Sequence, residues 1–238
     1  MTKTKKTRRL LIPLGILLLL AAAVLIFTLS GYRADARARA ALSSDAVRVE
    51  KTDYGWLFDG PSETEALIFS PGGNVEETAY APLLRALAQQ GLDVCLVRMP
   101  LRLAVLDGKA ADGVMARYDY DHWYIGGHSL GGAVAANYAA ERDLDGVILL
   151  AAYPTKPVDE PMLLICGSED GVVNRMRLDA AEDYGAVERF ELAGGNHAQF
   201  GDYGAQKGDG IAAISPEEQQ TLTAEAVAAW LARRETAG

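Results

Sequence analysis

The sequence predicts an α/β fold, with a mainly parallel, twisted sheet of about eight strands, helices on both faces and an antiparallel first pair of strands. The main observation is that short apolar runs alternate with helical patterns from residue 66 to residue 234. Most of these runs are continuously apolar, which is typical of parallel strands covered on both faces. The 238 residues are also half apolar, enough for one domain with a substantial core. One N-terminal transmembrane helix is expected to precede this domain.

The N-terminal segment has the composition of a membrane anchor. Residues 1–9 contain five basic and no acidic residues, and residues 10–30 contain no charge. A helix needs about 20 apolar residues to cross the hydrocarbon core. We therefore expect a cytoplasmic basic segment at 1–9, a single-pass anchor in the cell membrane at 10–30, a helical stalk at 31–45 and an extracytoplasmic domain at 46–238. The alternative is secretion after cleavage of a signal peptide, whose apolar part runs for only about 7–15 residues.

Charge and cysteine content restrict the partners and cross-links of the chain. The formal net charge is −9, and because residues 1–33 hold six basic and no acidic residues, the remainder carries −15. A domain this acidic is not expected to bind nucleic acid by neutralising phosphates. Cys95 and Cys166 lie in strand-like runs that are not neighbours in the predicted fold, so we expect buried, free thiols. The sequence leaves the oligomeric state open.

The domain begins with an antiparallel pair of strands. Residues 46–50 alternate apolar and charged side chains, as an edge strand does, and residues 56–58 follow after a short turn. Apolar runs predict further strands at residues 66–69, 94–97, 123–125, 146–150, 162–166 and 187–192. Helical patterns predict helices at residues 83–89, 104–117, 130–141, 173–183 and 215–234. Three prolines within residues 153–161 exclude a helix there, which leaves no room for a lid subdomain.

Residues 127–131 read G-x-S-x-G, between a predicted strand and a predicted helix, with Ser129 at the centre. This pattern is typical of a nucleophile on a sharp strand-to-helix turn. Strand and helix nearly touch at such a turn, so we expect Gly127, Gly131 and Gly132 to occupy positions without room for a side chain. Ser129 is therefore the predicted nucleophile.

A serine hydroxyl needs a base to take its proton, and the chain has three histidines. His122 opens the strand before Ser129 and is expected at the wrong end of the sheet. His128 adjoins Ser129 in a turn whose neighbouring side chains are expected to point apart. His197 directly follows the last predicted strand, and catalytic groups in such sheets lie beyond the C-terminal ends of strands. His197 is therefore the predicted base.

A carboxylate is needed to orient the base, and residues 167–171 supply two candidates after the next-to-last strand. We favour Asp170, because the glycines on either side indicate a tight turn that holds a short side chain at the strand end. Glu169 is the alternative. The chain order Ser129, Asp170, His197 is the order that this topology uses.

Fixed N–H groups must stabilise the charge that develops on the attacked carbonyl oxygen. One predicted donor is the amide of Leu130, at the N-terminus of the helix after Ser129. The other is expected in the loop after the strand at 66–69, where Gly73 is favoured and Asn74 is the alternative. Pro82 belongs in the first turn of a helix, so this helix should begin near residue 78 and leave the loop free to fold over the site.

Together, the strand order, residues 127–131, residues 167–170 and His197 resemble the α/β-hydrolase fold superfamily over residues 46–234. The nearest likeness is to compact, lid-less members of the dienelactone-hydrolase-like group. Dienelactone hydrolases proper use cysteine as nucleophile, whereas this chain has Ser129, so their substrate does not carry over. The resemblance implies that residues 46–238 form an α/β-hydrolase catalytic domain.

The expected function is that of a membrane-tethered, extracytoplasmic serine hydrolase that cleaves a small-molecule carboxylic ester through an acyl-enzyme. The mechanism implies no cofactor and no metal. Asp202 and Asp209, in the glycine-rich stretch after His197, do not match the spacing of a calcium-binding loop. Two alternatives remain: an amidase or peptidase with the same triad, and an inert surface-displayed binding or sensing domain on the same fold.

Overall fold

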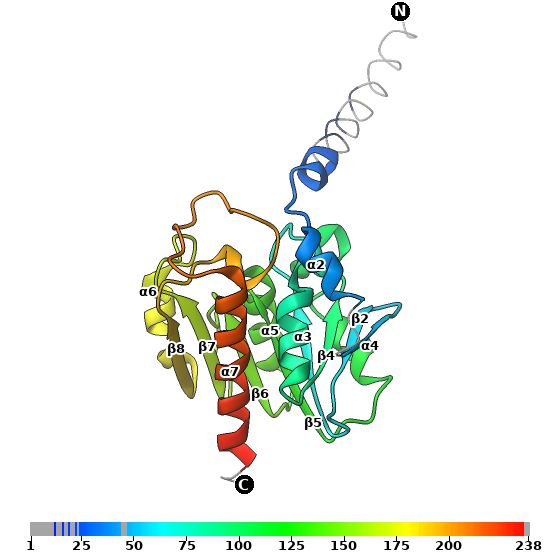
Figure 1. Cartoon of the computed structure of the whole chain (residues 1–238), viewed down its shortest axis with the longest axis vertical. Helices are drawn as coiled ribbons and strands as arrows, with labels where there is room; N and C mark the ends of the chain where they lie inside the picture. Colours follow the sequence, from blue (N-terminus) through cyan, green and yellow to red (C-terminus); the bar gives the residue numbers. More distant parts are fainter. Residues whose placement is uncertain are drawn as a thin grey trace, which may run out of the picture. The chain divides into compact units, whose positions relative to one another are not determined.

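The structure is a computed structural model that describes residues 12, 16, 19, 22, 24–43 and 47–235 (Figure 1). The chain divides into two units, Met1–Gly31 and Tyr32–Gly238. In the first unit, residues 24–29 are helical. Among the described residues, no helix is both long and apolar enough to cross a membrane. Much of the predicted anchor at 10–30 and all of the predicted basic segment at 1–9 lie outside the described residues.

The second unit contains an eight-stranded sheet with strand order β1-β2-β4-β3-β5-β6-β7-β8. The pairs β1–β2 and β2–β4 are antiparallel and the other neighbours are parallel. This arrangement confirms the predicted mainly parallel sheet and its antiparallel first pair. The strands are β1 (Arg48–Lys51), β2 (Gly55–Asp59), β3 (Glu65–Ser70), β4 (Asp93–Val97), β5 (His122–His128), β6 (Gly146–Leu150), β7 (Met162–Gly167) and β8 (Val187–Leu192).

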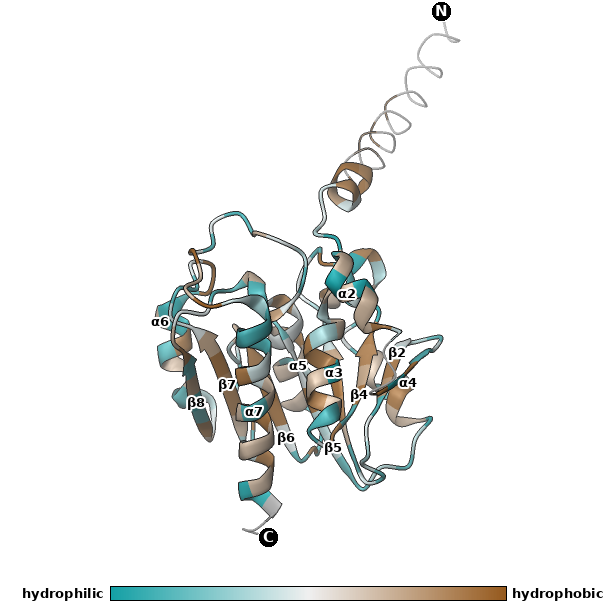
Figure 2. Cartoon of the chain, viewed as in Figure 1, coloured by the Kyte–Doolittle hydropathy of each residue, from teal (hydrophilic) through white to brown (hydrophobic). Residues whose placement is uncertain are grey.

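Helices cover both faces of the sheet, as predicted (Figure 1). One face carries α2 (Ala36–Ala41), α3 (Ala81–Gln89) and α7 (Pro216–Glu235), and the other carries α4 (Ala110–Met115), α5 (Leu130–Ala139) and α6 (Arg175–Asp179). Alternate strand residues supply the two cores, because successive side chains point to opposite faces. Figure 2 shows the resulting apolar strands between helices whose outer surfaces are more hydrophilic. Cys95 and Cys166 are buried and free, as expected.

The single helix predicted at residues 104–117 is replaced by two short segments, a 3-10 turn at Ala104–Leu106 and α4 (Ala110–Met115). Another 3-10 turn, Pro100–Arg102, precedes them. Just before this segment, Leu101 and Arg102 have φ of 49° and 59°, in the left-handed region, so a helix cannot extend toward residue 100. Asp107 then has φ of −146°, which ends the second turn. Turn-forming residues therefore divide a segment whose apolar spacing alone favours one helix.

Residues 32–42 differ from the expected stalk, because they are part of the folded domain. Tyr32 forms a parallel bridge with Val75, and the amide of Asp35 donates to the carbonyl of Asp202 over 2.9 Å. The buried face of α2 carries Ala38 and Ala41, whose small side chains allow close packing near α3. The alternation of arginine and alanine thus marks a short helix with one apolar face.

Candidate active site

Ser129 lies on a sharp turn between β5 and α5. Its backbone has φ of 53° and ψ of −122°, a strained conformation for a residue with a side chain. Its amide donates to the carbonyl of Leu150 on the neighbouring strand over 2.9 Å, and its carbonyl accepts from the amide of Ala133 in the helix over 3.1 Å. The turn is thereby held from both sides, and the side chain is half-buried at the C-terminal edge of the sheet.

The glycines around Ser129 fill positions that exclude any side chain. A Cβ atom on Gly127 or on Gly131 would lie 2.5 Å or 2.3 Å from the carbonyl oxygen of Ser70. A Cβ atom on Gly132 would lie 2.6 Å from Cβ of Ala152. These distances are well below van der Waals contact. The expectation that strand and helix leave no space at these three positions is confirmed.

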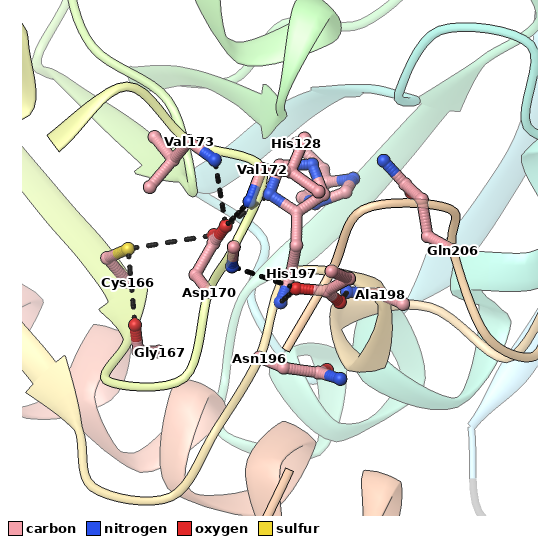
Figure 3. Close-up of polar contacts among 12 residues, drawn as sticks. His128, Cys166, Gly167, Asp170, Val172, Val173, Asn196, His197, Ala198 and Gln206 are labelled. Carbon is pink, nitrogen blue, oxygen red and sulfur yellow. Dashed lines mark hydrogen bonds and ion pairs between the residues drawn. The ribbon is translucent and has the colours of Figure 1, made fainter. Parts of the chain in front are cut away.

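Asp170 and His197 form a buried pair (Figure 3). Nδ1 of His197 lies 2.8 Å from Oδ2 of Asp170. The other carboxylate oxygen accepts from the amides of Val172 and Val173, each over 2.8 Å. The thiol of Cys166 lies 3.7 Å from Oδ2 and can donate a weak hydrogen bond to it. Asp170 is thus fixed by backbone donors on one side and aimed at the imidazole on the other. Glu169, the alternative acid, instead accepts from the hydroxyl of Ser168 next to it.

The surroundings of Asp170 keep its carboxylate charged. Burial acts to raise the pKa of Asp170, but the hydrogen bond and charge of His197 and the amides of Val173 and Val172 outweigh burial and lower the pKa below its usual value. A charged carboxylate accepts the Nδ1 proton of the neutral imidazole, so Nε2 is the unprotonated nitrogen. That tautomer is the one a general base requires.

Ser129 and His197 line the same cavity, of about 340 Å³. Nε2 of His197 is buried and makes no hydrogen bond within the described part of the chain. The nitrogen that would act as base is therefore available on the side of the imidazole away from Asp170. A larger cavity, of about 510 Å³, lies at the N-terminal ends of β7 and β8 and contains none of the predicted site residues. Ligand sites in such sheets lie at the opposite, C-terminal ends.

The other two histidines have distinct surroundings. His122 is exposed at the start of β5 and its Nδ1 lies 2.9 Å from Asp145, so it is at the far end of the sheet, as expected. The side chain of His128 does not point away from the site as expected. Its ring lies beside that of His197, with the two centroids 4.5 Å apart (Figure 3). Its Nδ1 lies 2.7 Å from the hydroxyl of Tyr80. Burial, together with His197, lowers the pKa of His128 well below its usual value, so this neighbour stays neutral beside the His197–Asp170 pair.

The loop after β3 closes next to the start of α5. A Cβ atom on Gly73 would lie 3.1 Å from Cδ2 of Leu130, so the two candidate donor residues are neighbours. The amide of Gly72 donates to the hydroxyl of Tyr80 over 3.0 Å, and the amide of Asn74 donates to the carbonyl of Arg102 over 2.8 Å. The Gly73 amide forms no hydrogen bond within the described residues. Of the two candidate donors in this loop, Gly73 and Asn74, the Asn74 amide is therefore already hydrogen-bonded, to Arg102.

Asp209 joins the loops that carry Asp170 and His197. Its Oδ1 accepts from the amides of Gly171 (3.1 Å) and His197 (3.1 Å), and its Oδ2 accepts from the amide of Ala198 (2.8 Å). Oδ1 also accepts from the amide of the next residue, Gly210. The sequence shows Asp209 only as a residue of a glycine-rich loop, and local spacing carries no signal for contacts with residues 11 to 38 positions away. Among the described residues, no cluster of three or more metal-ligating side chains is present.

Comparisons with known proteins agree with this architecture. A family model described as alpha/beta hydrolase family matches residues 66–221. A thermophilic esterase from the Planctomycetes species Thermogutta terrifontis has 16% identity and a TM-score of 0.55, over 79% of this chain and 94% of that one. The esterase domain of a Rhodothermus marinus protein has 18% identity and a TM-score of 0.56, over 78% and 96%. Ferulic acid esterase from Streptomyces cinnamoneus has 19% identity and a TM-score of 0.59, over 74% and 68%. A comparison with curated proteins found no match.

A mainly parallel sheet with a serine on a strained turn between a central strand and a helix is the architecture of the α/β-hydrolases. The family model spans more than half of the chain. The chain belongs to the alpha/beta hydrolase family, which confirms the resemblance inferred from its motifs.

Proposed function

We propose that this protein is a serine hydrolase that cleaves small carboxylic esters. The observation that carries the proposal is the buried contact of 2.8 Å between His197 and Asp170, in a site whose cavity is also lined by Ser129. A pure binding domain needs none of these three groups. The similar structures include esterases, among them a Thermogutta terrifontis esterase solved with butyrate and with propionate bound.

The proposed reaction passes through an acyl-enzyme. Oγ of Ser129 attacks the ester carbonyl carbon while Nε2 of His197 takes the hydroxyl proton, and Asp170 stabilises the imidazolium that forms. The tetrahedral intermediate collapses, the C–O bond to the alcohol breaks, and His197 gives its proton to the departing alcohol. Water then attacks the acyl-enzyme with His197 again as base, which releases the acid and restores Ser129. No metal or cofactor enters these steps.

The amides of Leu130 and Gly73 are the proposed donors to the oxyanion. Leu130 is the first residue of α5, where amides lack partners within the helix. Gly73 lies against Leu130, and the amides on either side of it are already bonded. Gly73 therefore supplies the one amide among residues 72–74 that remains available to a ligand.

A panel of p-nitrophenyl esters with increasing acyl length tests the proposed function. The cavity of about 340 Å³ is near the lower end of ligand-pocket sizes, and the three prolines before β7 leave no room for a lid subdomain between β6 and β7. We expect turnover of acetate and butyrate esters and a steep loss for long acyl chains. Turnover of anilides but not esters would favour the amidase alternative. A folded protein that hydrolyses neither would favour the binding-domain alternative.

We further propose that residues 10–30 anchor the protein in the cell membrane, with residues 1–9 cytoplasmic and the domain outside. The support is the charge-free run of that length after a basic segment. The full chain should stay in the membrane fraction after an alkaline carbonate wash, and protease added to intact cells should digest the domain. Release of a soluble form whose N-terminus lies after residue 30 would instead support signal cleavage.

Asp209 is expected to act as a positioning residue. Asp209→Asn turns one acceptor oxygen into a donor that faces the Ala198 amide, which displaces the His197 loop. Because small displacements of catalytic groups slow the reaction strongly, kcat should fall by at least about tenfold, while KM should stay within about twofold of the wild-type value. Asp53→Asn, an exposed acid far from the site, is the control and should leave both constants unchanged. Equal kinetics for Asp209→Asn and wild type would refute the positioning role.

A further inference from the structure

The cavity beside Ser129 has a catalytic side, an apolar wall and a cationic end. Ser129 and His197 form the catalytic side. The cationic end is formed by Arg177 of α6 and by Asn174, the residue that caps the start of this helix. The apolar wall consists of Leu130, Ala133, Ala151, Ala152, Val172 and Val173. A ligand whose reacting group meets Ser129 shares this cavity with apolar side chains and with the guanidinium group of Arg177.

The structure shows no contact by which the Arg177 side chain stabilises the described part of the fold. Its side chain is exposed and forms no ion pair within the described residues. Arg175, on the same helix, differs in this respect. Its guanidinium donates to the carbonyls of Gly167 and Ser168 and lies 3.6 Å from a carboxylate oxygen of Glu191. One arginine of α6 thus fixes the end of β7, whereas the other is available to a ligand.

The charges around the cavity make this arginine distinctive. Residues 34–238 carry a net charge of −15, yet the described lining contains no aspartate or glutamate, and Arg177 is its one lysine or arginine. Next to it, Oδ1 of Asn174 accepts from the Arg177 amide over 3.1 Å, so the NH₂ group of Asn174 is a second donor at the same end. A guanidinium and an amide NH₂ without a protein carboxylate are suited to bind an anionic group of the ligand.

We propose that the preferred substrates are esters that carry a second, negatively charged carboxylate on a short chain, such as half-esters of small dicarboxylic acids. This inference rests on the proposed ester hydrolysis at Ser129. The ester carbonyl lies at Ser129, the methylene chain lies along the apolar wall and the free carboxylate is bound by Arg177. A cavity of about 340 Å³ limits the chain between the two groups to a few carbons.

The test compares monoethyl glutarate with ethyl pentanoate, which have the same leaving group and the same acyl length and differ in the terminal carboxylate. Wild type should show the higher kcat/KM on the glutarate ester. Arg177→Gln should lower the ratio of the two kcat/KM values by at least about tenfold, mainly through the KM of the anionic ester. Arg177→Lys, which keeps the charge but not the planar fork, should give an intermediate ratio. The control Arg48→Gln, at the other edge of the sheet, should leave the ratio unchanged.

A ratio within about twofold of wild type in Arg177→Gln would overturn the inference, and so would an equal loss on both esters. If Arg177→Gln does not fold, Arg177→Lys replaces it in the test, and a ratio of the two kcat/KM values that equals the wild-type ratio would overturn the inference. A different result would show that the proposed ester hydrolysis itself is wrong. In that case wild type would hydrolyse neither ester and would not react with a fluorophosphonate at Ser129.

Discussion

Replacing Ser129 with alanine is expected to lower kcat for short p-nitrophenyl esters by about 10⁴- to 10⁶-fold. The change removes the one oxygen that forms the acyl-enzyme and leaves the carbon skeleton in place. Because the strained backbone at Ser129 is held by Leu150 and Ala133 through main-chain bonds, the turn should persist without the hydroxyl. Stopped-flow or steady-state release of p-nitrophenol measures the effect.

Ser43→Ala is the matched control for this prediction. Ser43 is exposed, and within the described part of the chain its hydroxyl bonds only to the carbonyl of Ala40, so its removal should not change turnover. Circular dichroism and thermal unfolding should show that both variants keep the fold of wild type. If Ser129→Ala retained a tenth or more of wild-type turnover, the nucleophile would have to be another group.

Replacing His197 with alanine is expected to reduce kcat by a comparable factor, up to about 10⁶-fold. Without the imidazole, the Ser129 hydroxyl loses its proposed base, and the carboxylate of Asp170 loses its partner at 2.8 Å. The measurement is the same esterase assay across pH 5 to 10. The residual rate of the variant should stay far below the wild-type rate throughout this range.

His122→Ala serves as the control for His197→Ala, because it removes the same side chain from the opposite end of the sheet. His122 is exposed and contacts Asp145, and its loss should change turnover by less than about twofold. If the two variants had similar activities, the assignment of the base by its place after the last strand would be wrong.

The sequence contained enough information to predict the sheet and its most constrained turn. Buried parallel strands leave apolar runs, and such runs located the six strands β3 to β8, whereas alternation and a short turn located the antiparallel pair β1 and β2. The role of the glycines at 127, 131 and 132 could be predicted because a sharp turn restricts the size of side chains only a few residues away in the sequence. The structure shows the close backbone approaches that these glycines permit. Asp170 and His197 follow strand ends, so parallel topology alone placed them at one edge.

Other features depend on contacts between distant residues and left no local signal. β5 continues through His128, so the alternation of side chains directs this residue to the face covered by α3, where Tyr80 and Phe200 surround it. Sequence reasoning treated position 128 as part of the turn and so missed its contact with His197. Asp209 is similar, because its role arises from amides in two other loops.

The N-terminal segment shows how a short pattern can be misjudged. Alternating arginine and alanine near an apolar run favours a continuous helix by propensity. In the structure, Tyr32 instead pairs with Val75, and Arg37 forms an ion pair of 2.6 Å with Asp202. The folded domain therefore begins at residue 32, and its first residues contact the loops on which Gly73 and Asp209 lie.

The most direct test of a nucleophilic Ser129 is reaction with a fluorophosphonate, followed by intact-mass measurement and peptide mapping. The account predicts one adduct per chain, located on Ser129, absent from Ser129→Ala and formed far more slowly by His197→Ala. A folded wild-type protein without an adduct, or an adduct that persists in Ser129→Ala, would contradict it.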